Sequence, residues 1–346
     1  MTDGHTAESG GESAARRIGR LMDGYLTTQL LYVAAKLGIA DVLAAGPLTG
    51  EVIAERVGAK AGPLVRVLRG LVLEGVLAEL PDGRFGLTEL GSCLCEAAPE
   101  AMRGPVVARG ELYYLAAGGL LRTVLEGGTA FEHAYGEPLF DHLGGHPQHE
   151  AAFHASMAGR ARQEADDVVV AYDFGSANRL VDVGGGTGIL AAAILRSAPR
   201  LRIELVDRPG VLADARRRVT ADGLADRCVC TVGDFFDSLP GGADTYLLSR
   251  VIHDWDDAAC RRILATVRAA MPPHGRVLLV EAILPERASD LPAAIRMDLH
   301  MLVLLGAKER TAAQYRGLLG EAGLRVERIL PTPSPAGLSV IEATIA

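Results

Sequence analysis

The sequence has little of what disulfide frameworks, membrane spans and nucleic-acid binders require. It contains five cysteines in 346 residues, none in a C-x-x-C spacing, so neither a disulfide framework nor a zinc ribbon is indicated. No apolar run approaches the ~20 residues that cross a bilayer. Acidic residues outnumber basic ones by 43 to 35, and the net charge is -8. This balance argues against a protein that binds by neutralising phosphates.

The N-terminal segment also lacks the apolar stretch of a secretory signal and carries Asp3, Glu8 and Glu12. We therefore expect a cytoplasmic protein without a membrane or nucleic-acid partner. Residues 1–13 are rich in Gly, Ser and Glu and are expected to form a disordered tail. The chain is long enough for two domains. Its 49% of hydrophobic residues is enough to form their cores.

Residues 14–100 predict a mainly helical domain. Apolar residues recur at helical spacing from Ala14 to about Leu43. Helices are predicted near 48–57 and 63–73, followed by two short strands around a Pro-Asp-Gly turn, which is the outline of a winged helix. The long apolar face of the first helix favours a homodimer. DNA recognition through Arg66 and Arg69 is the alternative, and the acidic balance disfavours it.

Residues 101–177 predict helices that link the domains and line a substrate pocket. Most of the histidines lie here. His142 and His146 are one turn apart if helical, which would permit metal ligation. Pro147 and the lack of a matching carboxylate or cysteine pattern favour a surface or pocket-lining role instead, and no metal is expected.

From residue 178 to 346 short strands alternate with helices. This alternation predicts an α/β fold, a doubly wound Rossmann-like sheet with ligands at the carboxyl ends of its strands. Strands are expected at 179–183, 201–206, 228–232, 245–248, 276–281, 324–330 and 338–344. Helices are expected at 189–197, 211–220, 258–271, 291–303 and 311–322.

A glycine-rich turn, Gly184 to Gly188, follows the first strand and leads into a helix. Its G-x-G-x-G spacing differs from the G-x-G-x-x-G of dinucleotide sites. Asp207 ends the next strand, where a carboxylate can accept both hydroxyls of a ribose. Asp234 and Phe235 follow the third strand and offer an acceptor for an adenine amino group beside an aromatic wall. Together these three strand ends predict a binding site for an adenosyl cofactor, formed by Gly184, Gly186, Asp207, Asp234 and Phe235.

Four segments then carry a family resemblance: Asp182–Gly188, Gly233–Phe236, Arg250–Asp257 and Gly306–Thr311. In these four segments the chain resembles the S-adenosylmethionine-dependent O-methyltransferases. That family includes the plant caffeate and isoflavone enzymes, the acetylserotonin enzyme and bacterial enzymes that tailor polyketides and antibiotics. The resemblance covers nearly the whole chain, including a winged-helix dimerisation domain at residues 14–100.

The resemblance implies transfer of a methyl group from S-adenosylmethionine to a hydroxyl of a small aromatic or polyketide-type secondary metabolite. S-adenosylhomocysteine is then the second product, and no metal is needed. His253 matches the family's general base, Glu281 the glutamate that hydrogen-bonds this base, and Glu309 a second flanking glutamate. A histidine has an ordinary pKa of about 6.5, so His253 is expected to be mostly neutral at pH 7 and able to accept a proton.

Further residues are expected around this centre. Ser249 stands where the plant enzymes carry a lysine near the adenine, Arg250 follows it, and Arg160 is a candidate partner for the methionyl carboxylate. The acceptor pocket is expected to include Met157, Met297, Asp298 and Met301, because methionines suit a flat aromatic acceptor.

Three rival functions stay open at this point. One is a hydroxylase or decarboxylase on the same fold, with S-adenosylmethionine as a structural ligand. Another is a winged-helix DNA-binding regulator that senses S-adenosylmethionine. The third is a nicotinamide dehydrogenase.

Overall fold

The computed structural model describes residues 13–98 and 101–346, except for the side chains of residues 158–160. The chain forms two compact units. One comprises the chain up to Leu115 with His146–Ser156, and the other comprises Ala116–Gly145 and Met157–Ala346. Segment 101–177 therefore contributes to both. Residues 1–12 of the expected tail lie outside the described residues, and Ser13 caps the first helix by accepting a hydrogen bond from Arg16 N.

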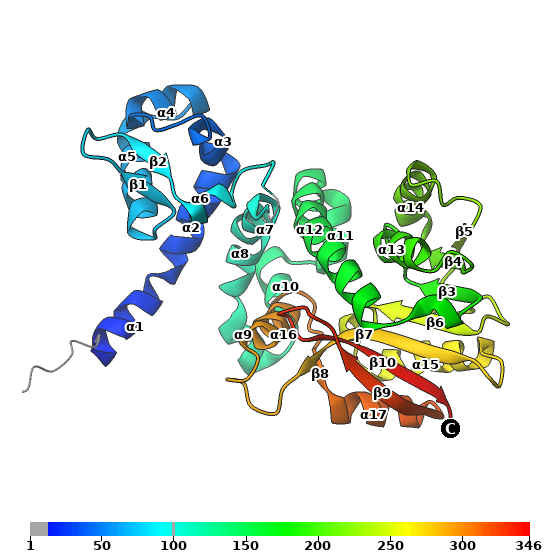
Figure 1. Ribbon diagram of the computed structural model, residues 1–346. Coiled ribbons are helices and arrows are strands. Elements are labelled where there is room, and N and C mark those ends of the chain that lie inside the picture. Colours follow the sequence, from blue (N-terminus) through cyan, green and yellow to red (C-terminus); the bar gives the residue numbers. More distant parts are fainter. Residues whose placement is uncertain (1–12, 99–100) are drawn as a thin grey trace, which may run out of the picture. The chain divides into compact units, whose positions relative to one another are not determined.

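The first unit is helical and contains one two-stranded hairpin (Figure 1). Strand β1 (Leu77–Glu79) pairs antiparallel with β2 (Phe85–Leu87), directly after helices α4 and α5. This order of two helices and a hairpin confirms the predicted winged-helix outline. The helices are α1 (Ala14–Met22), α2 (Gly24–Lys36), α3 (Ile39–Leu43), α4 (Gly50–Val57), α5 (Ala61–Leu73), α6 (Glu89–Ser92), α7 (Arg103–Ala108) and the π-helical turn η1 (Arg109–Tyr113).

The helical segment predicted from Ala14 to Leu43 is three helices rather than one. Asp23 ends α1, and its N–H donates to the carbonyls of Gly19 and Leu21. Gly38 separates α2 from α3, because it adopts φ 65°, a left-handed conformation that glycine tolerates best. The periodicity of apolar residues continues across both breaks, which is why the sequence pattern did not reveal them.

The second unit is built on an eight-stranded sheet. Its strand order is β5-β4-β3-β6-β7-β10-β9, with β8 beside β7. Strands β3 to β7 run parallel to one another, and β10 is antiparallel to both of its neighbours, β7 and β9. The strands are β3 (Arg179–Val183), β4 (Arg202–Asp207), β5 (Cys228–Val232), β6 (Thr245–Ser249), β7 (Arg276–Leu284), β8 (Arg310–Thr311), β9 (Leu324–Pro331) and β10 (Leu338–Ile345).

Helices cover both faces of this sheet (Figure 1). One core joins α12, α13 and α14 to one face, and a second core joins α15 and α17 to the other. Neighbouring strand residues alternate between the cores, as Leu247 and Leu248 do. The helices are α8 (Tyr114–Ala117), α9 (Leu120–Glu126), α10 (Ala130–Tyr135), α11 (Leu139–Gly145), α12 (Pro147–Ala171), η2 (Phe174–Ser176), α13 (Ile189–Ser197), α14 (Pro209–Ala221), η3 (Ile252–Asp254), α15 (Asp257–Ala270), α16 (Pro292–Leu304) and α17 (Ala312–Glu321). α8 and α12 each continue from the first unit into the second.

The strand order reverses beside β3, because β4 lies on one side of it and β6 on the other. Such a reversal opens a crevice at the carboxyl ends of the two strands, where ligands of doubly wound sheets bind. The predicted doubly wound α/β sheet is therefore confirmed, and it places the ends of β3 and β6 next to each other. Within residues 13–98 and 101–346, we find no helix with the length and apolarity needed to cross a membrane.

Tyr246 in β6 allows a test of how this sheet is held at its amino end. Its buried hydroxyl lies 2.8 Å from both the Pro240 and Ala270 carbonyl oxygens. Tyr246→Phe leaves these carbonyls without that donor, which costs about 1–2 kcal/mol. We expect the melting temperature to fall by about 2–4 °C for each kcal/mol. Tyr25→Phe, at an exposed position, is the matched control, and equal melting temperatures for the two variants would contradict the assignment.

Candidate active site

The glycine turn lies at the carboxyl end of β3 and needs glycine at three positions. Gly184, Gly186 and Gly188 have φ of 69°, 58° and 73°, all in the left-handed region. A Cβ on Gly184 would lie 3.0 Å from Val251 Cγ2, so the turn also approaches the segment that follows β6. The turn is therefore a tight backbone cradle with little room for side chains.

Asp207, at the end of β4, is bonded directly to this turn. Its Oδ2 accepts a hydrogen bond from Gly186 N at 2.8 Å, and its Oδ1 accepts one from Arg208 N at 2.7 Å. The structure thus brings together two groups of residues that the sequence predicted for one cofactor site.

Phe235 brings the end of β5 to the same place. A Cβ on Gly184 would lie 3.6 Å from Phe235 Cε1, and the Phe235 ring packs against Phe236 and Trp255 with centroid distances of 5.1 and 6.1 Å. Asp234 Oδ1 accepts a hydrogen bond from Phe236 N at 2.8 Å, which fixes the local turn. The predicted aromatic wall therefore lies beside the glycine turn.

Asp182 in β3 begins one of the four resemblance segments, but the sequence reasoning gave it no role. Its side chain is buried, and neither carboxylate oxygen has a hydrogen-bond partner among the described residues. Burial, with a contribution from Asp207, raises the pKa of Asp182 to about 7. An acid within the apolar run of a central strand was the signal available in the sequence. Unsatisfied buried oxygens beneath a glycine cradle fit a polar cofactor group better than an apolar one.

His253 lies in the turn η3 after β6, within a buried cluster of acids. Its Nδ1 donates to Glu309 Oε1 at 3.0 Å, and its Nε2 lies 3.3 Å from Asp254 Oδ1. Glu281 Oε1 accepts hydrogen bonds from Val251 N and Ile252 N, at 3.2 and 2.8 Å. The role expected for Glu281 therefore differs: Glu309 bonds the imidazole, and Glu281 holds the backbone beside it.

The charges of this cluster change the protonation expected for His253. Burial alone would lower its pKa, but Asp254, Glu281 and Glu309 outweigh burial and raise the pKa to about 9. Burial raises the pKa of Glu281 to about 7, while the positive charge of His253 opposes this shift. The imidazole thus favours its protonated form at pH 7, contrary to the expectation from an isolated histidine, because acids surround it.

Arg250 joins this cluster to helix α12. Its φ is 56°, and it is the one non-glycine residue with a positive φ in the described part of the chain. Its guanidinium donates to Glu164 Oε1 at 2.6 Å and to Glu309 Oε1 at 3.3 Å. These carboxylates raise the pKa of Arg250 against the effect of burial. Glu164 was missed by sequence reasoning, because nothing in its local pattern connects it to a residue 86 positions away.

The other predicted site residues lie on α12, α16 and the end of β6. Asp298 on α16 accepts a hydrogen bond from Glu309 N at 2.9 Å and so touches the cluster directly. Met297 and Met301 lie on α16, Met157 on α12, and Ser249 at the end of β6. The side chain of Arg160 lies outside the described residues. A separate cavity of about 310 Å³ lies over α13, and the residues that line it include none of the predicted ones.

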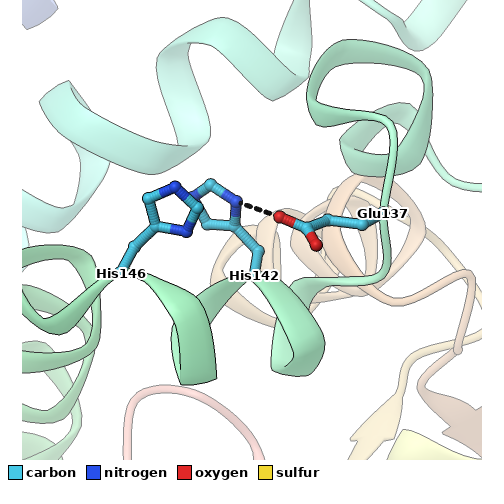
Figure 2. Close-up of side chains that lie close together, drawn as sticks. All are labelled: Glu137, His142 and His146. Carbon is cyan, nitrogen blue, oxygen red and sulfur yellow. Dashed lines mark hydrogen bonds and ion pairs between the residues drawn. The ribbon is translucent and has the colours of Figure 1, made fainter.

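His142 and His146 do not share a helix. α11 ends at Gly145 and α12 begins at Pro147, so His146 lies between them. Figure 2 shows that His142 Nδ1 is hydrogen-bonded to Glu137 Oε1, at 2.9 Å. The buried His142 ring also packs against Phe131 and Tyr135. These contacts support a packing role for His142 in the second unit.

Comparison with known proteins assigns the chain to a family. A model described as an O-methyltransferase domain matches residues 118–325. The chain belongs to this O-methyltransferase family. A second model, an O-methyltransferase dimerisation domain, matches residues 20–97 and confirms the nature of the predicted N-terminal domain.

Individual methyltransferases are similar to this chain along most of their length. Phenazine O-methyltransferase PhzM of Lysobacter antibioticus is 44% identical over 94% of both chains. The 8-amino-8-demethylriboflavin N,N-dimethyltransferase of Streptomyces davaonensis is 37% identical over 87% of this chain and 88% of the relative. The neocarzinostatin O-methyltransferase NcsB1, solved with S-adenosylmethionine and 2-hydroxy-5-methyl naphthoic acid, has a TM-score of 0.82 and 35% identity over 92% of this chain and 96% of its own. The predicted enzyme class is thereby confirmed.

Gly185 offers a test of the cradle without backbone strain, because its φ lies outside the left-handed region. A Cβ there would lie 2.6 Å from both Asp182 Oδ2 and Leu205 Cγ. Relieving such overpacking costs about 1–3 kcal/mol. If binding requires the present turn, Gly185→Ala should weaken S-adenosylhomocysteine binding about 5–100-fold in calorimetric titration. Gly210→Ala, which has no atom within 4 Å of its Cβ, is the control, and equal affinities would contradict this cradle.

Proposed function

We propose that this member of the O-methyltransferase family transfers the methyl group of S-adenosylmethionine to a hydroxyl of a small aromatic or polyketide-type metabolite. We also propose His253 as the general base. The observation that carries this proposal is the buried hydrogen bond from His253 Nδ1 to Glu309 Oε1, because it fixes the imidazole in a segment that abuts the glycine turn. A base oriented by a carboxylate is the arrangement that proton transfer requires.

The residues around the turn would hold the cofactor. The Gly184–Gly188 backbone receives its methionyl end, Asp207 its ribose hydroxyls, and Asp234 with Phe235 its adenine. Ser249, Arg250 and Arg160 complete the proposed set, with Arg250 acting through its contact with Glu309. When bound, S-adenosylmethionine supplies a methyl group that is already electrophilic. The protein then needs to align the acceptor and remove its proton, and alignment alone is worth effective molarities of about 10⁵–10⁸ M.

Proton removal falls to Nε2 of His253. Nδ1 is committed to Glu309, so the acceptor hydroxyl would approach Nε2, where Asp254 Oδ1 lies 3.3 Å away. The imidazolium formed by proton transfer is stabilised by Glu309, Glu281 and Asp254, the same carboxylates that raise the pKa of His253. This favours the protonated product of the transfer. It also means that the base must first lose a proton at neutral pH.

The acceptor pocket is proposed to lie at helices α12 and α16. Met157, Met297, Asp298 and Met301 are proposed to line its pocket, and methionines suit flat apolar rings. A hydroxyl acceptor agrees with the family, and an amine is the rival that the riboflavin relative raises. We further propose a cytoplasmic homodimer that does not bind DNA. The match to a dimerisation domain supports the dimer.

His253→Gln tests the base. Glutamine keeps a polar side chain but cannot accept and hold a proton at neutral pH, so kcat should fall by about 10²–10⁴-fold. The product from a panel of phenols and anilines is followed by mass spectrometry. An increase of 14 mass units on a phenol supports O-methylation, whereas 16 units or loss of 44 would indicate the rival hydroxylase or decarboxylase. S-adenosylhomocysteine affinity serves as the folding control. A kcat within about threefold of wild type would contradict the general base.

The pH dependence follows from the raised pKa of His253. Only the neutral imidazole accepts a proton, so kcat/KM should rise with pH by about tenfold per unit below the pKa and level off above it. With a pKa of about 9, this rise should extend through neutral pH rather than end near 6.5. The same profile for His253→Gln reports the ionisation of the acceptor alone. A wild-type plateau beginning below pH 7 would show that the acids do not act on His253 in this way.

A further inference from the structure

The turn that carries His253 is held from two sides by buried side chains of opposite charge. Glu281 Oε1 accepts the N–H of Ile252 at 2.8 Å, and Arg310 Nη1 donates to the carbonyl oxygen of the same residue at 3.0 Å. Arg310 Nη2 also donates to the carbonyl of Trp255 at 2.8 Å. The guanidinium therefore spans His253, bonding the residue before it and the second residue after it.

Arg310 is itself fixed in place. It is 1% exposed, and its strand β8 pairs with β7 through Ile283. Asp257 Oδ1, at the start of α15, accepts from Nη2 at 2.7 Å and from Nε at 3.1 Å. A planar guanidinium held by a carboxylate and directed at two carbonyls has little freedom to move.

The residue before Arg310 acts on the imidazole ring itself, since Glu309 accepts the hydrogen bond from His253 Nδ1. Adjacent residues of one short segment therefore reach the ring and the backbone on which the ring is mounted. A displacement of about 1 Å at a reacting group can cost about 10²-fold in rate. Backbone contacts that fix the turn should consequently affect catalysis through His253.

We propose that Arg310 is a positioning residue for His253: its guanidinium, anchored by Asp257, sets the turn 252–255 so that the imidazole meets the acceptor hydroxyl. This inference rests on the proposed role of His253 as the base. Neither substrate nor cofactor contact is assigned to Arg310. It acts only through the turn.

Arg310→Lys separates geometry from charge. Lysine keeps one positive charge but lacks the fork that reaches both carbonyls and the carboxylate. We expect kcat to fall about 10–100-fold. KM for S-adenosylmethionine should stay within about threefold, and the pH midpoint of the wild-type profile should be retained. Lys308→Met is the matched control, because Lys308 bonds Asp257 Oδ2 at 3.1 Å from an exposed position, and its kcat should stay near wild type.

A double-mutant cycle with His253→Gln decides the route of the effect. If Arg310 acts through His253, adding Arg310→Lys to His253→Gln should change kcat by less than about twofold. Equal losses in both backgrounds, or no loss in the wild-type background, would overturn the inference. If His253→Gln alone is as active as wild type, the general base itself fails, and this outcome is distinct from additivity of two real losses.

A second variant covers the case in which Arg310→Lys does not fold, judged by its melting temperature and its binding of S-adenosylhomocysteine. Asp257→Asn keeps the guanidinium but removes its anchoring charge. It should lower kcat about 3–10-fold, again only while His253 is present. A loss that persists in the His253→Gln background would overturn the inference as surely as it would for Arg310→Lys.

Discussion

The candidate active site of the second unit depends on one constraint: its carboxylates are withdrawn from water with too little fixed positive charge nearby to neutralise them. The buried Glu281 and Glu309 and the half-buried Glu164 all interact with the half-buried Arg250, which is hydrogen-bonded to Glu164 and Glu309. Removing an ion from water costs several kcal/mol. An excess of buried negative charge therefore favours the protonated forms of the groups in the cluster. The raised pKa of His253 and that of Glu281 have this common origin.

One of these buried acids also holds the backbone of the turn that carries His253. Glu281 uses one oxygen for two backbone N–H groups, and its other oxygen has no partner within the described residues. Arg250 sits at a positive φ, a conformation that costs a non-glycine residue about 1–3 kcal/mol. Such strain persists where surrounding contacts over-determine a conformation, and the two carboxylates on its guanidinium supply those contacts. Strain and buried charge therefore occur in one segment, beside the proposed base.

Much of this unit could be predicted from the sequence, because its signals are local. Apolar runs marked the strands, alternation with helices marked the sheet, and the glycines at 184, 186 and 188 are needed for left-handed φ values. The proximity of Asp207 and Phe235 to the glycine turn was predictable because the ends of parallel strands meet at one edge. The partners of the buried charges were not predictable. Glu164 is separated by 86 residues from Arg250, and Arg310 by 58 from Ile252. Only packing reveals such pairs, and the charge they share reverses the protonation expected for an isolated histidine.

Stability and catalysis consequently make opposite demands on pH. Asp182, Glu281 and His253 all have pKa values raised in the folded protein. A group of this kind stabilises the fold fully below its unfolded pKa and loses that contribution as pH rises through its folded pKa. For the two acids the loss extends from about 4 to about 7, and for His253 from about 6.5 to about 9. The proposed base becomes competent over the upper part of the same range. Deprotonation of His253 removes the cation that bonds Glu309 and favours the ionised form of Glu281. The proposed base is therefore ready to accept a proton in the state where the buried acids are least compensated.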